Sequence, residues 1–401
     1  MHSLEQALEK ILATALPLRP ETVALADAFG RIAVAETTSP VNLPPTDNSS
    51  VDGYAVLADD LKTAGSQSPV ALVLAGSSPA GVPFGGTLAS GTCVRVFTGS
   101  VLPHLADAIV MQEDVKVLPD DPAKIQFFEP IKLWENIRFL GEDVRKEARL
   151  VGIYEKITAP RLGLLAAAGI EEVLCFRRPE VGLIATGGEL REAGAPMEPG
   201  TIYESNRISL SALARQAGAA PKVFPLISDD LTATKRALEQ AFAVCDAVVT
   251  TGGVSVGEMD WVRTAFTEIG GELDLWQVAM RPGKPFAFGR RAGKLFFGLP
   301  GNPVSAMVTF FLLVRPALLR LQGAQEVEPP RQRAVLAKEL ANPGDSRHFM
   351  RVTMDSSGRA RPAGKQASHV LSATARSHGL VDVPPATTLP AGAVVEVLRW
   401  D

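Results

Sequence analysis

Apolar runs and amphipathic segments alternate regularly between residues 180 and 321, and this alternation constrains the fold more than any other feature of the sequence. Such a βαβα order builds a mainly parallel sheet covered by helices. Ligands of these sheets bind beyond the carboxyl ends of the strands. Strands are predicted at residues 181–186, 222–227, 247–251 and 295–299, and helices at 205–218, 229–242, 261–269 and from 303 onward.

One strand-to-helix junction, residues 299–305, reads Leu-Pro-Gly-Asn-Pro-Val-Ser. Asn302 suits the N-cap of a helix, and Pro303 suits the first helical position, where no amide hydrogen is needed. The free amides beyond it, with the positive end of the helix dipole, predict an anion site. Gly301 lets a ligand approach the backbone closely, while Pro300 and Pro303 shape the turn. An ordinary capped junction is the alternative.

Two further segments favour an anion site. Residues 248–260 carry a strand into a loop with three glycines and then two acids, and such a loop can wrap an anion. Residues 280–289 read Met-Arg-Pro-Gly-Lys-Pro-Phe-Ala-Phe-Gly, so two prolines fix the backbone while Arg281 and Lys284 present positive charge. Each segment alone is weak evidence for an anion site, because glycine turns and surface cations are common. With the junction at 299–305 they predict a phosphate or oxyanion site at one edge of the sheet.

The regions on either side of the sheet have a different texture. Residues 3–16 predict an amphipathic helix, and residues 23–45 an extended segment bounded by proline. A short helix at 161–168 is expected to lead into a strand near Val173. Short Val, Ile and Leu runs separated by Gly and Pro predict β structure in the remaining regions. The expected domains are an elongated linker (1–45 plus 146–178), an inserted mostly-β domain (46–145), an α/β domain (179–328) and a small C-terminal β domain (329–401).

Composition excludes several classes of protein. The chain has 401 residues, a net charge of −4 and 46% hydrophobic residues, which argues against disorder and against a dedicated nucleic-acid surface. The first 18 residues mix acids and a lysine with leucines, unlike a signal peptide, and Arg315 and Pro316 interrupt the longest apolar stretch. A cytoplasmic protein without a membrane span is therefore expected. The three cysteines and five histidines show no metal-ligand spacing, which leaves open a magnesium held by carboxylates and phosphates.

A further motif lies near the other end of the chain, where residues 44–56 read Pro-Pro-Thr-Asp-Asn-Ser-Ser-Val-Asp-Gly-Tyr-Ala-Val. This motif, the glycine loop of 248–260, Pro-Gly-Lys-Pro-Phe and Leu-Pro-Gly-Asn-Pro-Val-Ser together resemble the molybdopterin molybdenumtransferases, the family of MoeA and the gephyrin E domain. The resemblance covers essentially the whole chain. It implies a MogA-like sheet domain and an elongated homodimer, with each active site between the sheet domain of one subunit and the inserted domain of the other.

The resemblance also implies a reaction. Adenylylated molybdopterin and molybdate bind, the pyrophosphate bond is cleaved, AMP leaves, and molybdenum is placed on the dithiolene, with Mg²⁺ or a similar divalent cation assisting. Cations, amides and a metal should then converge, because molybdate and pyrophosphate are both anionic. Other proteins of molybdenum cofactor biosynthesis are expected partners, whereas nucleic acids and membranes are not.

Five acids match family positions and form the expected catalytic set. Asp229 suits a helix N-cap equally well, Asp143 a surface turn, and Asp52 a turn before Gly53. Asp52 is expected to serve the metal or substrate of the other subunit. The set is Asp52, Asp143, Glu189, Asp229 and Asp260, with Glu189, Asp260 and Asp52 as the expected metal ligands.

Other matching positions are expected to bind substrate, although Thr98 also suits a β-turn. The chain departs from the family pattern at Gln277, where some relatives carry lysine, and at Arg281, where lysine is frequent, so the choice between molybdate and tungstate stays open. Gly188 replaces an acid often found before the glutamate. The expected substrate-binding residues are Thr98, Gly252, Gly253, Ser255, Arg281, Lys284, Pro300, Gly301, Asn302, Pro303, Ser305, Arg351 and Ser368.

Two other functions stay open. A non-catalytic molybdopterin-binding or scaffold protein would share the fold, because relatives anchor receptors, but it would not need the five acids. A molybdopterin adenylyltransferase has a similar sheet domain, but such enzymes are usually single small domains without the flanking regions of this chain.

Overall fold

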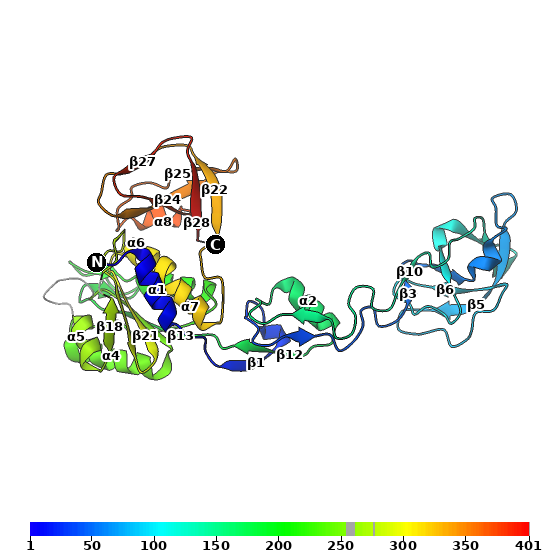
Figure 1. Ribbon diagram of the computed structural model, residues 1–401, viewed down its shortest axis with the longest axis horizontal. Coiled ribbons are helices and arrows are strands. Elements are labelled where there is room, and N and C mark those ends of the chain that lie inside the picture. Colours follow the sequence, from blue (N-terminus) through cyan, green and yellow to red (C-terminus); the bar gives the residue numbers. More distant parts are fainter. Residues whose placement is uncertain (254–260, 276, 401) are drawn as a thin grey trace.

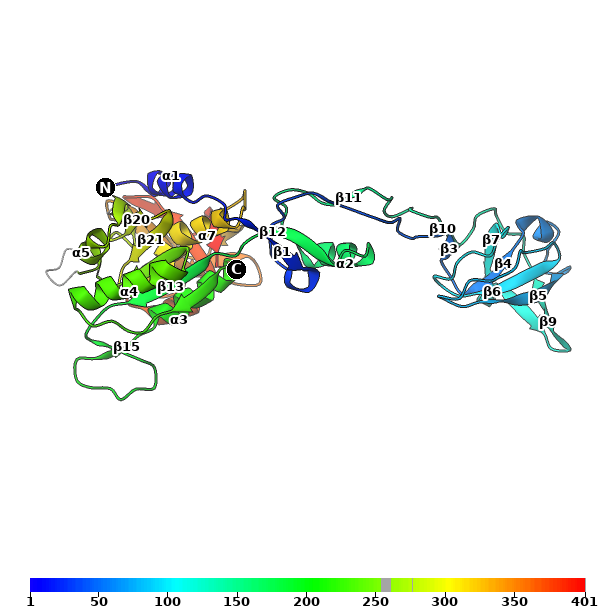
Figure 2. The same ribbon diagram turned by 90° about the horizontal axis from the view of Figure 1, so that it is seen from below.

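The computed structural model describes residues 1–253, 261–275 and 277–400. The molecule is elongated, with the sheet domain and the C-terminal domain at one end and a β domain at the other (Figure 1). A narrow middle segment joins the two ends, and the view from below in Figure 2 shows the same order. The predicted multidomain α/β fold is confirmed.

The sheet domain contains six strands in the order β16-β13-β17-β21-β20-β18. The first four are parallel neighbours, whereas β20 runs antiparallel to both β21 and β18. One predicted strand ends early, because Pro225 cannot donate to a ladder and Ile227 keeps only an isolated bridge to Thr186. The strands span Glu180–Ala185 (β13), Ala220–Val223 (β16), Ala247–Thr251 (β17), Glu272–Leu275 (β18), Ala287–Arg291 (β20) and Lys294–Leu299 (β21).

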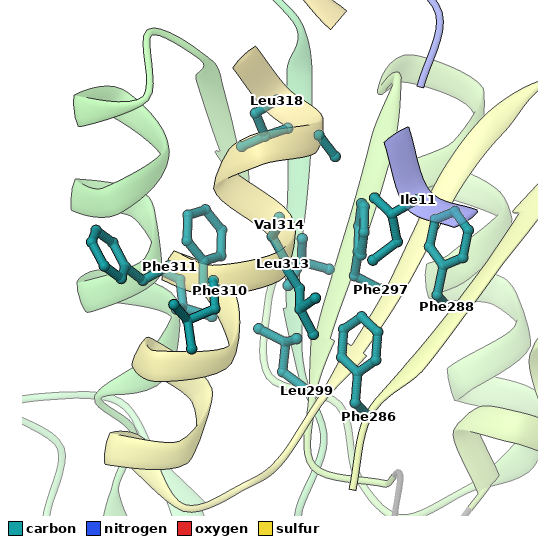
Figure 3. Packing of buried hydrophobic residues seen from close by; sticks show 14 of the residues in the cluster. Ile11, Phe286, Phe288, Phe297, Leu299, Phe310, Phe311, Leu313, Val314 and Leu318 are labelled. Carbon is teal, nitrogen blue, oxygen red and sulfur yellow. The ribbon is translucent and has the colours of Figure 1, made fainter. Parts of the chain in front are cut away.

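Helices cover both faces of this sheet. One apolar core joins the sheet to five helical elements, and Figure 3 shows Phe297 of the sheet beside Leu313 and Ile11 from two of them. A second core joins the other face to α4 and α5. The first group is α1 (Leu4–Thr14), α3 (Asn206–Gln216), the run α6 (Pro303–Thr309), η4 (Phe310–Val314) and α7 (Arg315–Leu321), and the second is α4 (Leu231–Val244) and α5 (Trp261–Glu268).

The run from α6 to α7 is one continuous helix, in which η4 is a π-helical turn. Arg315 and Pro316 therefore do not end it; Pro316, which has no amide hydrogen, comes directly after the π-helical turn, where the regular hydrogen-bond pattern of the helix is already interrupted. This helix, Pro303–Leu321, is long and apolar enough to cross a membrane, but 78% of its apolar window is buried inside the protein. It is the central core helix of the sheet domain.

The middle segment consists of two short antiparallel pairs, β1 with β12 and β2 with β11, packed against α2. The N-terminal helix α1 is not part of it, because Ala7 and Ile11 are fully buried in the core of the sheet domain. Assigning residues 1–45 as a whole to the linker was therefore wrong for the first helix. The elements are β1 (Pro20–Ala24), η1 (Leu25–Asp27), β2 (Thr37–Thr38), β11 (Arg149–Val151), α2 (Ala159–Ala167) and β12 (Glu172–Phe176).

The distal domain is a six-stranded sheet in the order β7-β4-β6-β5-β9-β8, with a small β3–β10 pair where the chain enters and leaves. Its own apolar cores lie on the two faces of this sheet. The elements are β3 (Asn48–Ser49), β4 (Gly53–Val56), η2 (Ala58–Leu61), β5 (Val70–Ser78), β6 (Thr92–Val96), β7 (Ala108–Met111), η3 (Gln112–Asp114), β8 (Val115–Leu118), β9 (Asp121–Phe127) and β10 (Ile137–Arg138).

The C-terminal domain is a small barrel, because β24 pairs with both β25 and β26 and so closes the ring β24-β25-β22-β28-β26. Strand β19 (Met280–Arg281), which comes from the sheet domain, pairs in parallel with the start of β24. The remaining elements are β22 (Arg331–Leu336), β23 (Leu340–Asn342), β24 (Arg347–Met354), β25 (Arg359–Pro362), α8 (Leu371–Ala375), β26 (Gly379–Val383), β27 (Thr387–Leu389) and β28 (Val394–Arg399).

Candidate active site at the carboxyl ends of the sheet

The turns that follow β13, β17 and β21 lie side by side. The amide of Thr186 donates to the carbonyl of Thr251 at 3.2 Å, and the amide of Gly252 donates to the carbonyl of Leu299 at 3.2 Å. The strand pairing thus continues into the turns. Sequence reasoning predicted a site at this edge, and the structure brings the three turns together there.

Gly252 and Gly253 adopt left-handed backbone conformations, with φ of +81° and +66°. A Cβ atom on Gly252 would lie 2.7 Å from the carbonyl oxygen of Thr186, which is closer than Cβ atoms approach oxygen in proteins. Only glycine fits this turn. At Gly301, by contrast, an added Cβ would meet nothing nearer than 3.7 Å, so that glycine leaves room beside the backbone.

A cavity of about 560 Å³ opens at these turns. A volume of this size suits a small-molecule ligand. Its walls come from the three turns, from the segment before α3, and from one residue of the C-terminal domain. They are Thr186, Glu189, Leu190, Ile202, Tyr203, Glu204, Ser205, Asn206, Thr251, Gly252, Gly301, Asn302, Pro303 and His369.

The junction into α6 has the predicted form, with Asn302 at the N-cap and Pro303 at the first helical position. The side chain of Asn302 makes no capping bond, which leaves it exposed at the cavity. The amides beyond it are not all free, because the Val304 amide donates to the carbonyl of Ser368 at 3.2 Å. Ser305 is buried, at 4% exposure. The amide of Val304 is therefore not among the free amides that the sequence predicted beyond Pro303.

Two acids flank the turn after β13. The Asp229 carboxylate accepts a hydrogen bond from the Gly188 amide at 2.9 Å, and a Cβ on Gly187 would lie 2.6 Å from the Glu189 carboxylate. Asp229 does not cap α4; the N-cap is Asp230, whose carboxylate accepts from the amide of Ala233 at 2.7 Å. Asp229 is thus free for a role at the turn.

No cluster of three or more metal-ligating side chains occurs within the described ranges. Magnesium usually needs only one or two carboxylates, with substrate phosphates and water completing its shell. Glu189 and Asp229, on either side of one glycine turn, fit that requirement. Ser255 and Asp260 lie outside the described residues.

The cations of the 280–289 segment lie between the sheet and the C-terminal barrel. Arg281 is exposed on β19, paired in register with His348, and Lys284 is exposed three residues later. Burial, and then the charges of Arg281 and Arg351, lower the pKa of His348 to about 4, so this histidine is neutral at physiological pH. Neither Arg281 nor Lys284 is among the described residues that line the cavity.

Arg351 has a different position from the one expected for an anion contact. It is only 2% exposed. Its guanidinium donates to the carbonyls of Lys365 and Val370 at 3.0 and 3.2 Å, and its amide to the Gln366 side chain at 2.9 Å. Arg351 thus holds the loop that carries Ser368 and His369 to the cavity.

The sequence search missed residues at the start of α3. Glu204 is buried, and its carboxylate accepts from the amide and Nε of Arg207 at 3.0 and 2.9 Å. Asn206 donates from Nδ2 to the carbonyl of Gly301 at 2.8 Å, and its buried Oδ1 has no partner among the described groups. Their position along the chain could have identified them: Asn206 is the first residue of the helix after β13, just as Pro303 is the first residue of the helix after β21.

The remaining predicted acids lie in the distal part of the molecule. Asp52 accepts from the amide and hydroxyl of Thr98 at 2.8 and 2.9 Å, and these bonds, amide first, hold its pKa below the ordinary value. Asp143 is exposed, and its amide donates to the carbonyl of Leu43 at 3.0 Å. Within one chain the structure joins Asp52 to Thr98 and places Glu189 and Asp229 at one glycine turn, but these two pairs lie at opposite ends of the molecule (Figure 1).

Comparisons with known proteins cover the whole chain. Residues 2–169 match the MoeA N-terminal region (domain I and II), residues 182–320 a probable molybdopterin binding domain, and residues 333–400 the MoeA C-terminal region (domain IV). Molybdopterin molybdenumtransferase of Haemophilus influenzae is 38% identical over 94% of this chain and 93% of its own length. Molybdopterin molybdenumtransferase 2 of Mycobacterium tuberculosis is 37% identical over 100% of both. A crystal structure of the molybdopterin biosynthesis MoeA protein from Pyrococcus horikoshii, 29% identical, covers 100% of both chains with a TM-score of 0.83.

Proposed function

The chain belongs to the MoeA family of molybdopterin molybdenumtransferases, and from this premise we propose that it inserts molybdenum from molybdate into adenylylated molybdopterin and releases AMP. The observation that carries the proposal is the cavity of about 560 Å³ at the carboxyl ends of three adjacent strands. Glycine turns, acids and a helix start surround it, as a site for a phosphorylated ligand requires.

In this proposal the residues of the sheet domain bind and orient the anionic substrates. Gly301 and Asn302 present backbone to the ligand, and Arg281 and Lys284 add positive charge near the C-terminal barrel. Glu189 and Asp229 would hold Mg²⁺, a metal that usually takes one or two protein carboxylates. Bound there, the metal would neutralise charge on the pyrophosphate as its bond breaks.

The proposal includes a homodimer. Asp52 and Thr98 match family positions but lie far along the molecule from the cavity (Figure 1). A second copy in an antiparallel arrangement would bring its distal domain to the cavity, and a symmetric pair would complete two sites. Other proteins of cofactor biosynthesis are proposed to deliver or receive the substrates.

A cytoplasmic location is also part of the proposal. All three cysteines are free and buried, as is usual in a reducing compartment. Burial raises the pKa of Cys93 to about 12, which makes this thiol unreactive.

Product analysis tests the proposed reaction. Purified protein is mixed with adenylylated molybdopterin and Mg²⁺, and AMP release is measured as molybdate and then tungstate are titrated. Molybdate-dependent AMP release with active cofactor is expected, and Glu189→Gln should lower it at least about tenfold, as losses around metal ligands do. Glu239→Gln, an exposed acid on α4, is the matched control.

The two other functions give different results in the same assay. ATP consumption with molybdopterin, without AMP release on addition of molybdate, would indicate an adenylyltransferase. Tight binding of adenylylated molybdopterin without turnover would indicate a scaffold. Either result would contradict the proposed transfer.

A further inference from the structure

A second cavity, of about 510 Å³, lies where the middle segment meets the sheet domain, and we call it the hinge cavity. Its walls come from the loops around Phe29 and Tyr154, from the end of α3 and from α7. It shares no lining residue with the candidate active site. Because α3 runs back from the carboxyl ends of the strands, its last turn places the hinge cavity at the opposite edge of the sheet.

The hinge cavity is strongly cationic. Lys156, Arg178, Arg215 and Arg315 line it, and Glu326 is the one acid among its lining residues. The chain as a whole has more acids than bases, 44 against 40, so this excess of positive charge is local.

None of the four cations has a carboxylate partner among the ion pairs of the described residues. Arg178 donates to the carbonyl of Phe29 at 3.2 Å, and Arg315 to the carbonyl of Val327 at 3.0 Å. Arg315 is half-buried, and burial lowers its pKa. Arg315 also lies over the ring of Phe311, 5.8 Å from its centroid. A half-buried guanidinium without a carboxylate partner keeps an uncompensated charge, which an anion in the cavity would offset.

Aromatic rings line the same cavity. Tyr154 is 46% exposed, and its ring stacks on Phe176 with centroids 5.7 Å apart and planes 11° apart. Phe29 is 60% exposed. A partly exposed ring that stacks on a second ring offers a platform for a planar group.

We propose that the hinge cavity binds a nucleoside phosphate, with its phosphate on Lys156, Arg178 and Arg215 and its base against Tyr154. The site is separate from the proposed active site. Since its walls belong to both the middle segment and the sheet domain, a bound nucleotide stabilises one orientation of these two parts.

Calorimetric titration of the full-length protein with AMP tests the site. Arg215→Glu and Tyr154→Ala should each weaken one class of AMP sites at least about tenfold, the loss expected for one charge-assisted contact and for one base-stacking contact, respectively. Arg236→Glu, an exposed cation on α4 with the same change of charge, should leave the isotherm unchanged. Both substituted hinge side chains are exposed, so the variants should fold.

Pyrophosphate, which lacks a base, separates the two halves of the proposal: Arg215→Glu should weaken its binding and Tyr154→Ala should not. Unchanged AMP binding in both hinge variants would overturn the site. The site would also be overturned if the hinge variants changed the oligomeric state of the protein without changing AMP binding. The cations would then pair with carboxylates of a second copy. Molybdate-dependent AMP release reports on the proposed active site and does not decide this test.

Discussion

At the scale of single residues, glycine geometry separates the structural part of the candidate site from the part that a ligand reaches. Gly252 has φ of +81° and no room for a side chain, because the Thr186 carbonyl lies against it. Gly301 has room and is exposed. The sequence marked both as glycines of one site, but only the structure shows that they serve different purposes.

Substituting these two glycines should give opposite results. Gly252→Ala should destabilise the sheet domain by about 1 to 3 kcal/mol, the cost of a strained backbone. Gly301→Ala should leave thermal stability unchanged but weaken binding of adenylylated molybdopterin. Thermal unfolding and ligand titration of both variants check this; equal loss of stability in both would contradict it.

The Asp52–Thr98 pair predicts a shift in titration. Two donors from Thr98 lower the pKa of Asp52, so the stabilisation it provides is complete above the unfolded pKa and disappears as the pH falls through the lower folded pKa. Thr98→Val keeps the shape and the amide bond but removes the hydroxyl donor. The Asp52 pKa should therefore rise toward its ordinary value, as carboxyl NMR titration would show, and an unchanged pKa would argue against the hydroxyl bond.

At the scale of elements, the segment between β13 and α3 is fixed by a buried ion pair. Glu204 and Arg207 have side chains 2% and 4% exposed, and Arg207 also binds Glu192, which is 61% exposed. Strands β14 (Leu190–Arg191) and β15 (Ile202–Tyr203) close the loop beside them. This ion pair therefore positions the part of the cavity wall that is formed by the start of α3.

Neutralising the two glutamates should have unequal effects. Glu204→Gln leaves a buried guanidinium with a weaker partner and should destabilise α3 by about 3 kcal/mol. Glu192→Gln, at the exposed end of the same arginine, should cost less than about 1 kcal/mol. Hydrogen exchange of the α3 amides in urea measures both, and equal costs would contradict the buried-pair account.

The periodicity of apolar residues predicted the long elements of the sheet domain well. Helices there are buried on one face and strands on both faces, and this burial determines the spacing of their apolar residues. Strand β17 matches its predicted bounds, and α4 is only two residues longer than predicted at its end. Strands β18 and β20 were not predicted from periodicity. The burial of Arg351 and the packing of α1 on the sheet domain were not predicted either, since both depend on contacts between segments far apart in sequence.

At the scale of the whole molecule, the elongated shape divides the predicted catalytic set. The distal domain carries Asp52 and Thr98, and the sheet domain carries Glu189 and Asp229 (Figure 1). The middle segment keeps them apart in one chain. A site made from two copies is the arrangement that gives both pairs a common substrate, and it is the central claim of the proposed function.

Mixing two inactive variants tests this claim most directly. Asp52→Ala and Asp229→Ala should each abolish molybdate-dependent AMP release as homodimers. After mixing in equal amounts and subunit exchange, about a quarter of the wild-type activity should return, because half of the randomly paired dimers then contain one intact site of two. Recovered activity near that level is the predicted result, and no recovery despite confirmed mixed dimers would contradict a site shared between subunits.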